Sequence, residues 1–168
     1  MTTTTPALEI TGAVLELGDG ESRVRALDEV SLTVNPGEFV AIVGPSGSGK
    51  SSLLAIAGAL SHPDSGTVRV HGTDLRSLSR RALSRFRLKN LGFVFQSGNL
   101  IPALTSADQL RLAARLAGTR GVDVEALLDS IGMAHRANHR PGHDRDVLEY
   151  CDRVVEMIDG KLGVLAAV

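Results

Sequence analysis

Eight consecutive residues constrain the fold of this chain more than any other feature: Gly44-Pro45-Ser46-Gly47-Ser48-Gly49-Lys50-Ser51. They fit the pattern G-x-x-x-x-G-K-[ST] at every required position. The apolar run 39–43 before them is typical of a strand buried on both faces. Residues 50–60 after them favour a helix, and the side predicted to face the core carries Leu53, Leu54, Ala57 and Leu60.

The residue types of this phosphate loop (Gly44–Ser51) predict its chemistry. Glycines let successive backbone N–H groups turn inward and surround a phosphate at the N-terminus of a helix. In this pattern Lys50 reaches the β- and γ-phosphates of a nucleotide, and the hydroxyl of Ser51 holds Mg²⁺. The alternative, an ordinary glycine-containing turn, is disfavoured because the flanking strand and helix patterns are both in place.

The rest of the chain predicts a mixture of strands and helices. Two β-rich segments flank Gly18-Asp19-Gly20, and a final pair flanks Asp159-Gly160, a strong two-residue hairpin signal. Expected strands cover 7–17, 24–34, 39–43, 67–70, 91–95 and a hairpin over 153–165, and expected helices cover 50–60, 77–88, 108–117 and 124–133.

Length and composition exclude several classes of protein. A chain of 168 residues with 43 % hydrophobic residues has a core for one domain, so we expect 1–168 to be a single domain. The longest apolar run, Leu53–Leu60, is too short to cross a bilayer, and the N-terminus lacks the pattern of a signal peptide. The single cysteine, Cys151, excludes an intrachain disulfide and favours a cytosolic location and a buried structural thiol. The net charge of −1 gives no general attraction to nucleic acid or lipid.

Several short segments accompany the phosphate loop: Ser52-Leu53-Leu54, Gly58, Pro63-Asp64-Ser65-Gly66 and Gly92-Phe93-Val94-Phe95-Gln96. Together they resemble the ATP-binding subunits of ABC transporters. Residues 99–105 are similar to the branch that serves lipoprotein and macrolide exporters. The resemblance implies an α/β P-loop NTPase with an N-terminal antiparallel β region, a central parallel sheet and a C-terminal β-hairpin.

The resemblance also assigns roles to individual residues. Gln96 matches the glutamine that touches Mg²⁺ and the attacking water, and His143 matches the histidine that contacts the γ-phosphate, so both are expected to be catalytic. Ser51 and Gln96 are the expected metal ligands. Leu17 or Val24 stands where the family stacks an aromatic ring on adenine, and an aliphatic side chain there gives up ~1–3 kcal/mol. The remaining expected nucleotide contacts are Gly44, Pro45, Ser46, Gly47, Ser48, Gly49, Lys50, Ser51 and Ser52.

One departure from the family pattern is severe. After His139-Arg140-Pro141 the family continues into a Leu-Ser-Gly-Gly-Gln signature and two strands, whereas here Gly142 and His143-Asp144 follow at once. The sequence contains no Ser-Gly-Gly and no aliphatic run that ends in Asp-Glu. We therefore expect a domain truncated internally near 141–143, with fewer strands in its parallel sheet and unpaired strand edges.

The resemblance implies an ATP-binding subunit whose family couples ATP hydrolysis to export through a membrane permease. It places the chain in the cytoplasm, peripheral at the inner face of the cell membrane, with possible dimers with itself or with an intact subunit. Because the signature and the catalytic glutamate are missing, we expect impaired hydrolysis. The alternatives are a non-hydrolysing nucleotide-binding partner subunit and a deletion product without function.

Three other features have simpler interpretations. The six basic residues between Arg76 and Lys89 indicate a solvated helix face, and we expect no nucleic-acid partner because no aromatic platform accompanies them. His135, His139 and His143 recur every four residues, but Pro141 interrupts any helix that would align them as metal ligands. Residues 97–107 are either a surface loop or, by resemblance, a segment that faces the permease.

Overall fold

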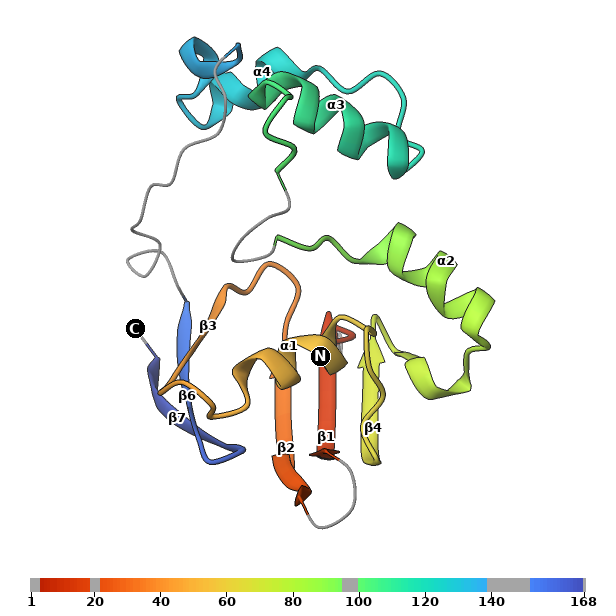
Figure 1. Cartoon of the computed structure of the whole chain (residues 1–168), viewed down its shortest axis with the longest axis vertical. Helices are drawn as coiled ribbons and strands as arrows, with labels where there is room; N and C mark the ends of the chain where they lie inside the picture. The colour runs from red at the N-terminus through yellow and green to blue at the C-terminus, as the bar shows by residue number, and fades with distance from the viewer. Residues whose placement is uncertain (1–3, 19–21, 95–99, 139–151, 168) are drawn as a thin grey trace. The chain divides into compact units, whose positions relative to one another are not determined.

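The computed structural model describes residues 4–18, 22–94, 100–138 and 152–167 (Figure 1). The chain forms two compact units, one of residues 1–87 with 146–168 and the other of residues 88–145. No helix within the described ranges is both long enough and apolar enough to span a bilayer.

An antiparallel sheet with strand order β2-β1-β4-β5 dominates the first unit. Strands β1 (Leu8–Leu17), β2 (Val24–Val34), β4 (Ser65–Val70) and β5 (Thr73–Asp74) form it. The buried residues are Ile10, Ala13 and Leu15 in β1 and Leu27, Val30 and Leu32 in β2. The period of two is interrupted between Ile10 and Ala13 and between Leu27 and Val30, where the ladder has register shifts. The β1–β2 hairpin confirms the prediction for 7–17 and 24–34.

A second sheet of the same unit has the order β3-β6-β7. Strand β3 (Val40–Val43) pairs in parallel with β6 (Arg153–Ile158), which forms a hairpin with β7 (Lys161–Ala167). Phe39 fixes this register, because its N–H donates to Asp152 Oδ2 at 2.6 Å and its carbonyl accepts from the Asp152 N–H at 2.8 Å. Among the described strands β3 pairs only with β6, so its other edge is open, as expected for a shortened parallel sheet.

Helix α1 (Lys50–Ala57) follows the phosphate loop and packs against β1, β2 and β4. Its buried residues are Leu53 and Ile56. The predicted apolar side was therefore wrong in part: Leu54 and Leu60 are 57 % and 50 % exposed. The helix ends at Ala57, and the chain then turns through Ala59 with φ +56°, so Leu60 never joins the helical face.

Helix α2 (Arg80–Asn90) follows a 3-10 turn, η2 (Leu75–Ser77), and its buried residue is Leu83. Its residues Arg80, Arg81 and Arg85 are exposed, whereas Arg87 is half-buried and donates to Ala59 O at 2.7 Å. The strand predicted at 91–95 is wrong over its described part, because residues 91–94 form no strand and Val94 is fully exposed. A strand needs a neighbouring strand to satisfy its backbone, and no described strand pairs with this segment.

The second unit contains α3 (Ser106–Leu116), α4 (Val124–Ser130) and the 3-10 turn η3 (Ala134–Arg136). Its small core consists of Ala107, Val124 and Leu128, against which Leu110, Met133 and Ala137 pack. The side chains of Thr105 and Asp123 cap α3 and α4 by accepting from Asp108 N and Ala126 N. Both helices match the predicted segments, with α4 ending three residues earlier than predicted.

Candidate functional site

The phosphate loop connects the end of β3 to the start of α1, in the context that the sequence predicts. Gly44, Gly47 and Gly49 have φ values of +143°, +81° and +103°, which L-residues with a side chain rarely adopt. A Cβ on Gly44 would lie 2.1 Å from Met157 O, and one on Gly49 would lie 2.3 Å from Ala26 O. The two outer glycines are therefore required both by backbone conformation and by close packing.

Lys50 folds back over the phosphate loop. Its Nζ donates to Gly44 O at 2.8 Å, to Pro45 O at 2.7 Å and weakly to Ser48 Oγ at 3.4 Å. All three ammonium protons thus have acceptors within the loop. The charge lies at the centre of the loop, where the phosphates of a nucleotide would replace the carbonyl oxygens as its partners.

The concave side of the loop is open and rich in donors. Ser46 and Gly47 are exposed, and a Cβ on Gly47 would meet nothing within 4 Å. Ser51 is exposed at the first turn of α1, and Ser52 is half-buried. The first N–H groups of a helix have no partner within it, so this donor set fits a polyphosphate, and the Ser51 hydroxyl fits Mg²⁺.

The convex side of the loop rests on two elements that are distant in sequence. Ser48 is almost fully buried, and its carbonyl accepts from Gly160 N at 3.0 Å. The Gly160 carbonyl in turn accepts from Asp28 N on β2 at 2.9 Å. Met157 of β6 is fully buried behind the loop. The sequence predicts Ser48 as a nucleotide contact and Gly160 as part of a hairpin turn, but it predicts neither their hydrogen bond nor any role for Asp28 and Met157, because only the folded chain brings β2, β6 and the loop together.

Strand β2 approaches the loop because of a β-bulge. Leu15 is opposite Leu27 and the next residue, Glu16, is opposite Arg25, so Ala26 is the extra residue of β2. Bulges redirect the backbone locally. Here the Ala26 carbonyl faces both Gly49 and Gly160.

Leu17 and Val24, the candidates for covering adenine, are partners at the turn end of the β1–β2 hairpin. They are 49 % and 66 % exposed. Val24 is two residues from Ala26, so at ~3.3 Å per residue it lies ~7 Å along the strand from the carbonyl that meets Gly49. An exposed apolar pair at this distance is available to cover a nucleotide base.

A network of charges lies on the same end of β2. Asp28 accepts from Arg25 NH1 at 2.9 Å and lies 3.2 Å from Lys161 Nζ. The hydrogen bond that Asp28 accepts from Arg25, and then the one from Lys161, lower the pKa of Asp28, and donating to Asp28 raises the pKa of Arg25. Arg25 and Arg23 both also pair with Glu16 at 3.5 Å. The network ties the hairpin β1–β2 to β7.

The two predicted catalytic residues, Gln96 and His143, lie outside the described residues, as do His139, Pro141 and Cys151. No group of three or more His, Cys, Asp or Glu side chains with metal-binding geometry occurs in the described part of the chain. In the described site, Ser51 is the one predicted metal ligand.

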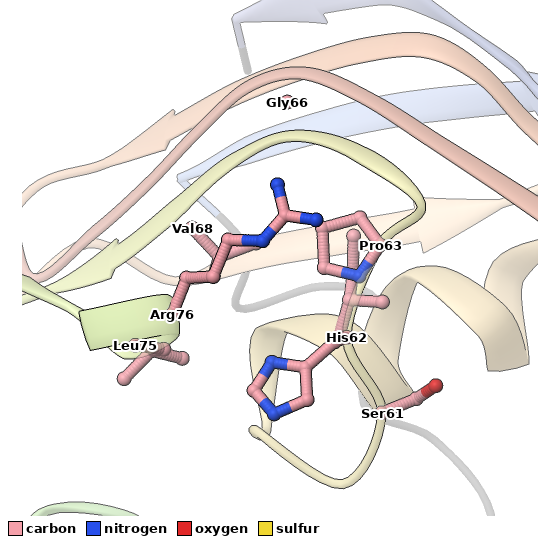
Figure 2. Close-up of a pocket in the computed structure, with 8 residues that line it drawn as sticks. Ser61, His62, Pro63, Gly66, Val68, Leu75 and Arg76 are labelled. Atoms are coloured by element: carbon pink, nitrogen blue, oxygen red, sulfur yellow. The ribbon is translucent and has the colours of Figure 1, made fainter. Parts of the chain in front are cut away.

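A small pocket beside α1 offers no second site (Figure 2). Its volume of about 10 Å³ has room for one water molecule. Arg76 and Pro63 both line this pocket, and the Arg76 guanidinium donates to Asp64 O at 3.3 Å. The lining residues are Ile56, Ser61, His62, Pro63, Gly66, Val68, Leu75 and Arg76.

Comparison with known families decides what kind of domain carries this loop. The family described as "ABC transporter" matches residues 27–151, which is most of the chain. The chain belongs to the ABC transporter family of ATP-binding domains.

Two relatives of this ABC domain are 42 % identical to it. The macrolide export ATP-binding/permease protein MacB of Marinobacter nauticus aligns over 140 residues, 81 % of this chain and 22 % of the relative. The lipoprotein-releasing system ATP-binding protein LolD of Geobacter metallireducens aligns over 139 residues, 80 % of this chain and 62 % of the relative. The chain therefore spans less than two thirds of either relative.

Solved structures confirm the fold of the ABC domain. A dimeric post-hydrolysis state of the ATP-binding cassette MJ0796, bound to ADP and Pi, superposes with a TM-score of 0.75 at 24 % identity. The superposition covers 96 % of this chain and 100 % of that one. This fold is the predicted one: an α/β ABC ATPase domain with an antiparallel β region, a shortened parallel sheet and a C-terminal hairpin.

Proposed function

We propose that this chain binds Mg·ATP through Gly44–Ser52 as the ATP-binding subunit of an exporter of the LolD or MacB type. The observation that carries the proposal is the phosphate loop, which has its three glycines at positive φ, Lys50 at its centre and an open, donor-rich concave side. Bound Mg²⁺ would neutralise charge on the terminal phosphates. The chain contributes Lys50 as a cation that exchanges the Gly44 and Pro45 carbonyls for phosphate oxygens, and Ser51 as a hydroxyl ligand.

The partner in this proposal is a membrane permease, and the location is the cytoplasmic face of the cell membrane. The support comes from the relatives, since MacB is named an ATP-binding/permease protein and LolD an ATP-binding protein of a lipoprotein-releasing system. The superposed cassette is dimeric, which supports pairing of this chain with itself or with an intact subunit. Residues 1–168 act as one nucleotide-binding domain in this proposal, shortened near 141–143.

Hydrolysis is proposed to be impaired. In this family the carboxylate that acts as the base comes directly after an aliphatic strand. The sequence has no aliphatic strand that ends in Asp-Glu, and it has no Ser-Gly-Gly, the core of the signature. Loss of a general base costs ~10²–10⁴-fold in rate. Gln96 and His143 remain as the proposed contacts to water and the γ-phosphate. Absence of the base and of the signature favours a second candidate, a non-hydrolysing partner that supplies one phosphate loop to an asymmetric dimer with an intact subunit.

Thermal unfolding of the 168-residue chain with Mg·ATP tests the binding proposal. At 100 times the dissociation constant, ATP should stabilise the chain by ~2.7 kcal/mol, a rise in Tm of roughly 5–10 °C. Lys50→Ala should abolish the shift, and Lys89→Ala, on the solvent-exposed face of α2, should keep it. An equal shift in both variants would refute binding at the phosphate loop.

An assay of phosphate release, with the chain alone and with an intact homologous subunit, separates the two candidates. If neither the chain alone nor the mixture releases phosphate, the asymmetric-dimer candidate is refuted. Turnover by the chain alone at about 1 s⁻¹ or more, within the usual enzyme range, refutes impaired hydrolysis.

A further inference from the structure

We infer that the C-terminal hairpin positions the phosphate loop, through a chain of contacts that runs from Lys161 and Asp28 through Gly160 to Ser48. The inference rests on the proposed nucleotide binding and extends it by naming positioning residues outside the phosphate-loop motif. The positioning residues Asp28, Gly160 and Lys161 do not belong to the pattern G-x-x-x-x-G-K-[ST], whereas Ser48 is the residue of the loop that they hold. They act on the loop amides rather than on the nucleotide.

Two backbone hydrogen bonds form the centre of this connection. Gly160 donates its N–H to Ser48 O at 3.0 Å and accepts from Asp28 N at 2.9 Å. The single residue Gly160 therefore bridges the phosphate loop and β2. Ser48 and Gly160 are both buried, so neither bond is readily replaced by water.

Packing makes the connection rigid. Gly160 has a φ of +76°, and a Cβ on it would lie 3.1 Å from Ala26 O. Met157, three residues earlier, packs closely against the glycines at both ends of the loop. Its carbonyl excludes a side chain at Gly44, and its Cε excludes one at Gly49. The loop is thus held at both ends and in the middle by β6 and its turn.

An ion pair holds the turn against β2. Lys161 follows Gly160 directly, and its Nζ lies 3.2 Å from Asp28 Oδ2, while Arg25 occupies Oδ1. The N–H of the same Asp28 makes the bond to Gly160 O. The Lys161 side chain is 71 % exposed and its ion pair is with Asp28, so its removal acts on the loop through Asp28 and Gly160. That makes Lys161 a clean point of perturbation.

The test compares Lys161→Met, Lys161→Arg and Gly160→Ala with the wild-type chain. Arg69→Met is the matched control, because it removes a similar exposed ion pair, Arg69–Glu9 at 3.6 Å, between β4 and β1. The first readout is the NMR order parameters of the Gly47–Lys50 amides in the nucleotide-free chain. The second is the dissociation constant for Mg·ATP and for inorganic tripolyphosphate, which has no base.

We expect Lys161→Met to lower the order parameters of the loop and to raise both dissociation constants by the same factor, about 2–5-fold. Lys161→Arg should restore both readouts, and Gly160→Ala should weaken binding about tenfold or more. Arg69→Met should change neither readout, although its effect on Tm should match that of Lys161→Met to within about 4 °C.

Unchanged loop order parameters in both Lys161→Met and Gly160→Ala would overturn the inference. So would an equal loss of order in Arg69→Met, because that would mean general loosening. If the wild-type chain fails to bind Mg·ATP, the proposed function fails instead. The order parameters of the nucleotide-free chain still decide the positioning inference in that case.

Discussion

Replacing Gly49 by alanine separates two reasons why the phosphate loop needs glycine. Gly49 is the N-cap residue of α1, with a φ of +103°. Its Cβ would lie 2.3 Å from the Ala26 carbonyl oxygen and 2.9 Å from Met157 Cε. Gly47 provides the control, since its φ is +81° but a Cβ there would have nothing within 4 Å. Both substitutions strain the backbone, and only Gly49→Ala also forces neighbouring atoms apart.

The expected magnitudes follow from these two terms. A side chain at positive φ costs ~1–2 kcal/mol, so this is the full expected destabilisation for Gly47→Ala. A Cβ at 2.3 Å from a backbone oxygen requires movement of the β2 bulge, and overpacking of this kind costs a further ~1–3 kcal/mol. Gly49→Ala should therefore destabilise the chain by ~2–5 kcal/mol.

Equilibrium urea denaturation measures the difference. With an m-value of about 2 kcal/mol/M, the midpoint of Gly49→Ala should lie ~0.5–1.5 M below that of Gly47→Ala. The comparison is valid only if the two m-values agree. Equal midpoints would refute the close approach of β2 to the phosphate loop and, with it, the account of why the loop is held from behind.

Three further predictions concern other parts of the chain. Met157→Ala removes a fully buried side chain behind the loop and should cost ~2–5 kcal/mol, measured by the same denaturation. Thr105→Ala removes the cap whose Oγ1 accepts from Asp108 N at 3.2 Å, and should cost the second unit about 1 kcal/mol, seen as faster amide exchange in α3. The lowered pKa of Asp28 means that its contribution to stability is complete above the unfolded pKa of about 3.9 and is lost as pH falls through the lower folded value. Asp28→Asn should therefore flatten the acid limb of the Tm profile below about pH 4.

Local patterns predicted the elements that satisfy their own backbone or pair with a near neighbour in sequence. The hairpin β1–β2 follows from two alternating segments around a glycine turn, and the hairpin β6–β7 follows from Asp159-Gly160, whose φ values of +46° and +76° are those of a type I′ turn. The motif likewise predicted the positions of Gly44, Lys50 and Ser51. These features depend on a few consecutive residues, so the sequence contains enough information to define them.

Contacts between distant segments could not be read in this way. Nothing in the residues around Asp28 indicates that its N–H meets Gly160, 132 positions later in the numbering. The bulge at Ala26 has no sequence signal either, because alanine is not typical of bulges. The convex side of the site is built from such contacts, so the motif predicts the residues that we propose to face the phosphates but not the residues that hold the loop.

The errors share a physical cause with the proposed truncation. Hydrophobic periodicity predicted burial for Leu54, Leu60 and the segment 91–95, yet Leu54, Leu60 and Val94 are exposed and β3 has an open edge among the described strands. Hydrophobic periodicity shows which residues are suited to a buried position. Those residues are buried only if the helix or strand that would cover them is present. In the proposed truncation, the strands lost near 141–143 are the ones that would pair with the free edge of β3. The phosphate loop is held without them, because its supports come from β2 on one side and from β6 and its turn on the other. The proposed function is consistent with this arrangement, because the supports of the phosphate loop do not include the strands that the proposal takes as lost.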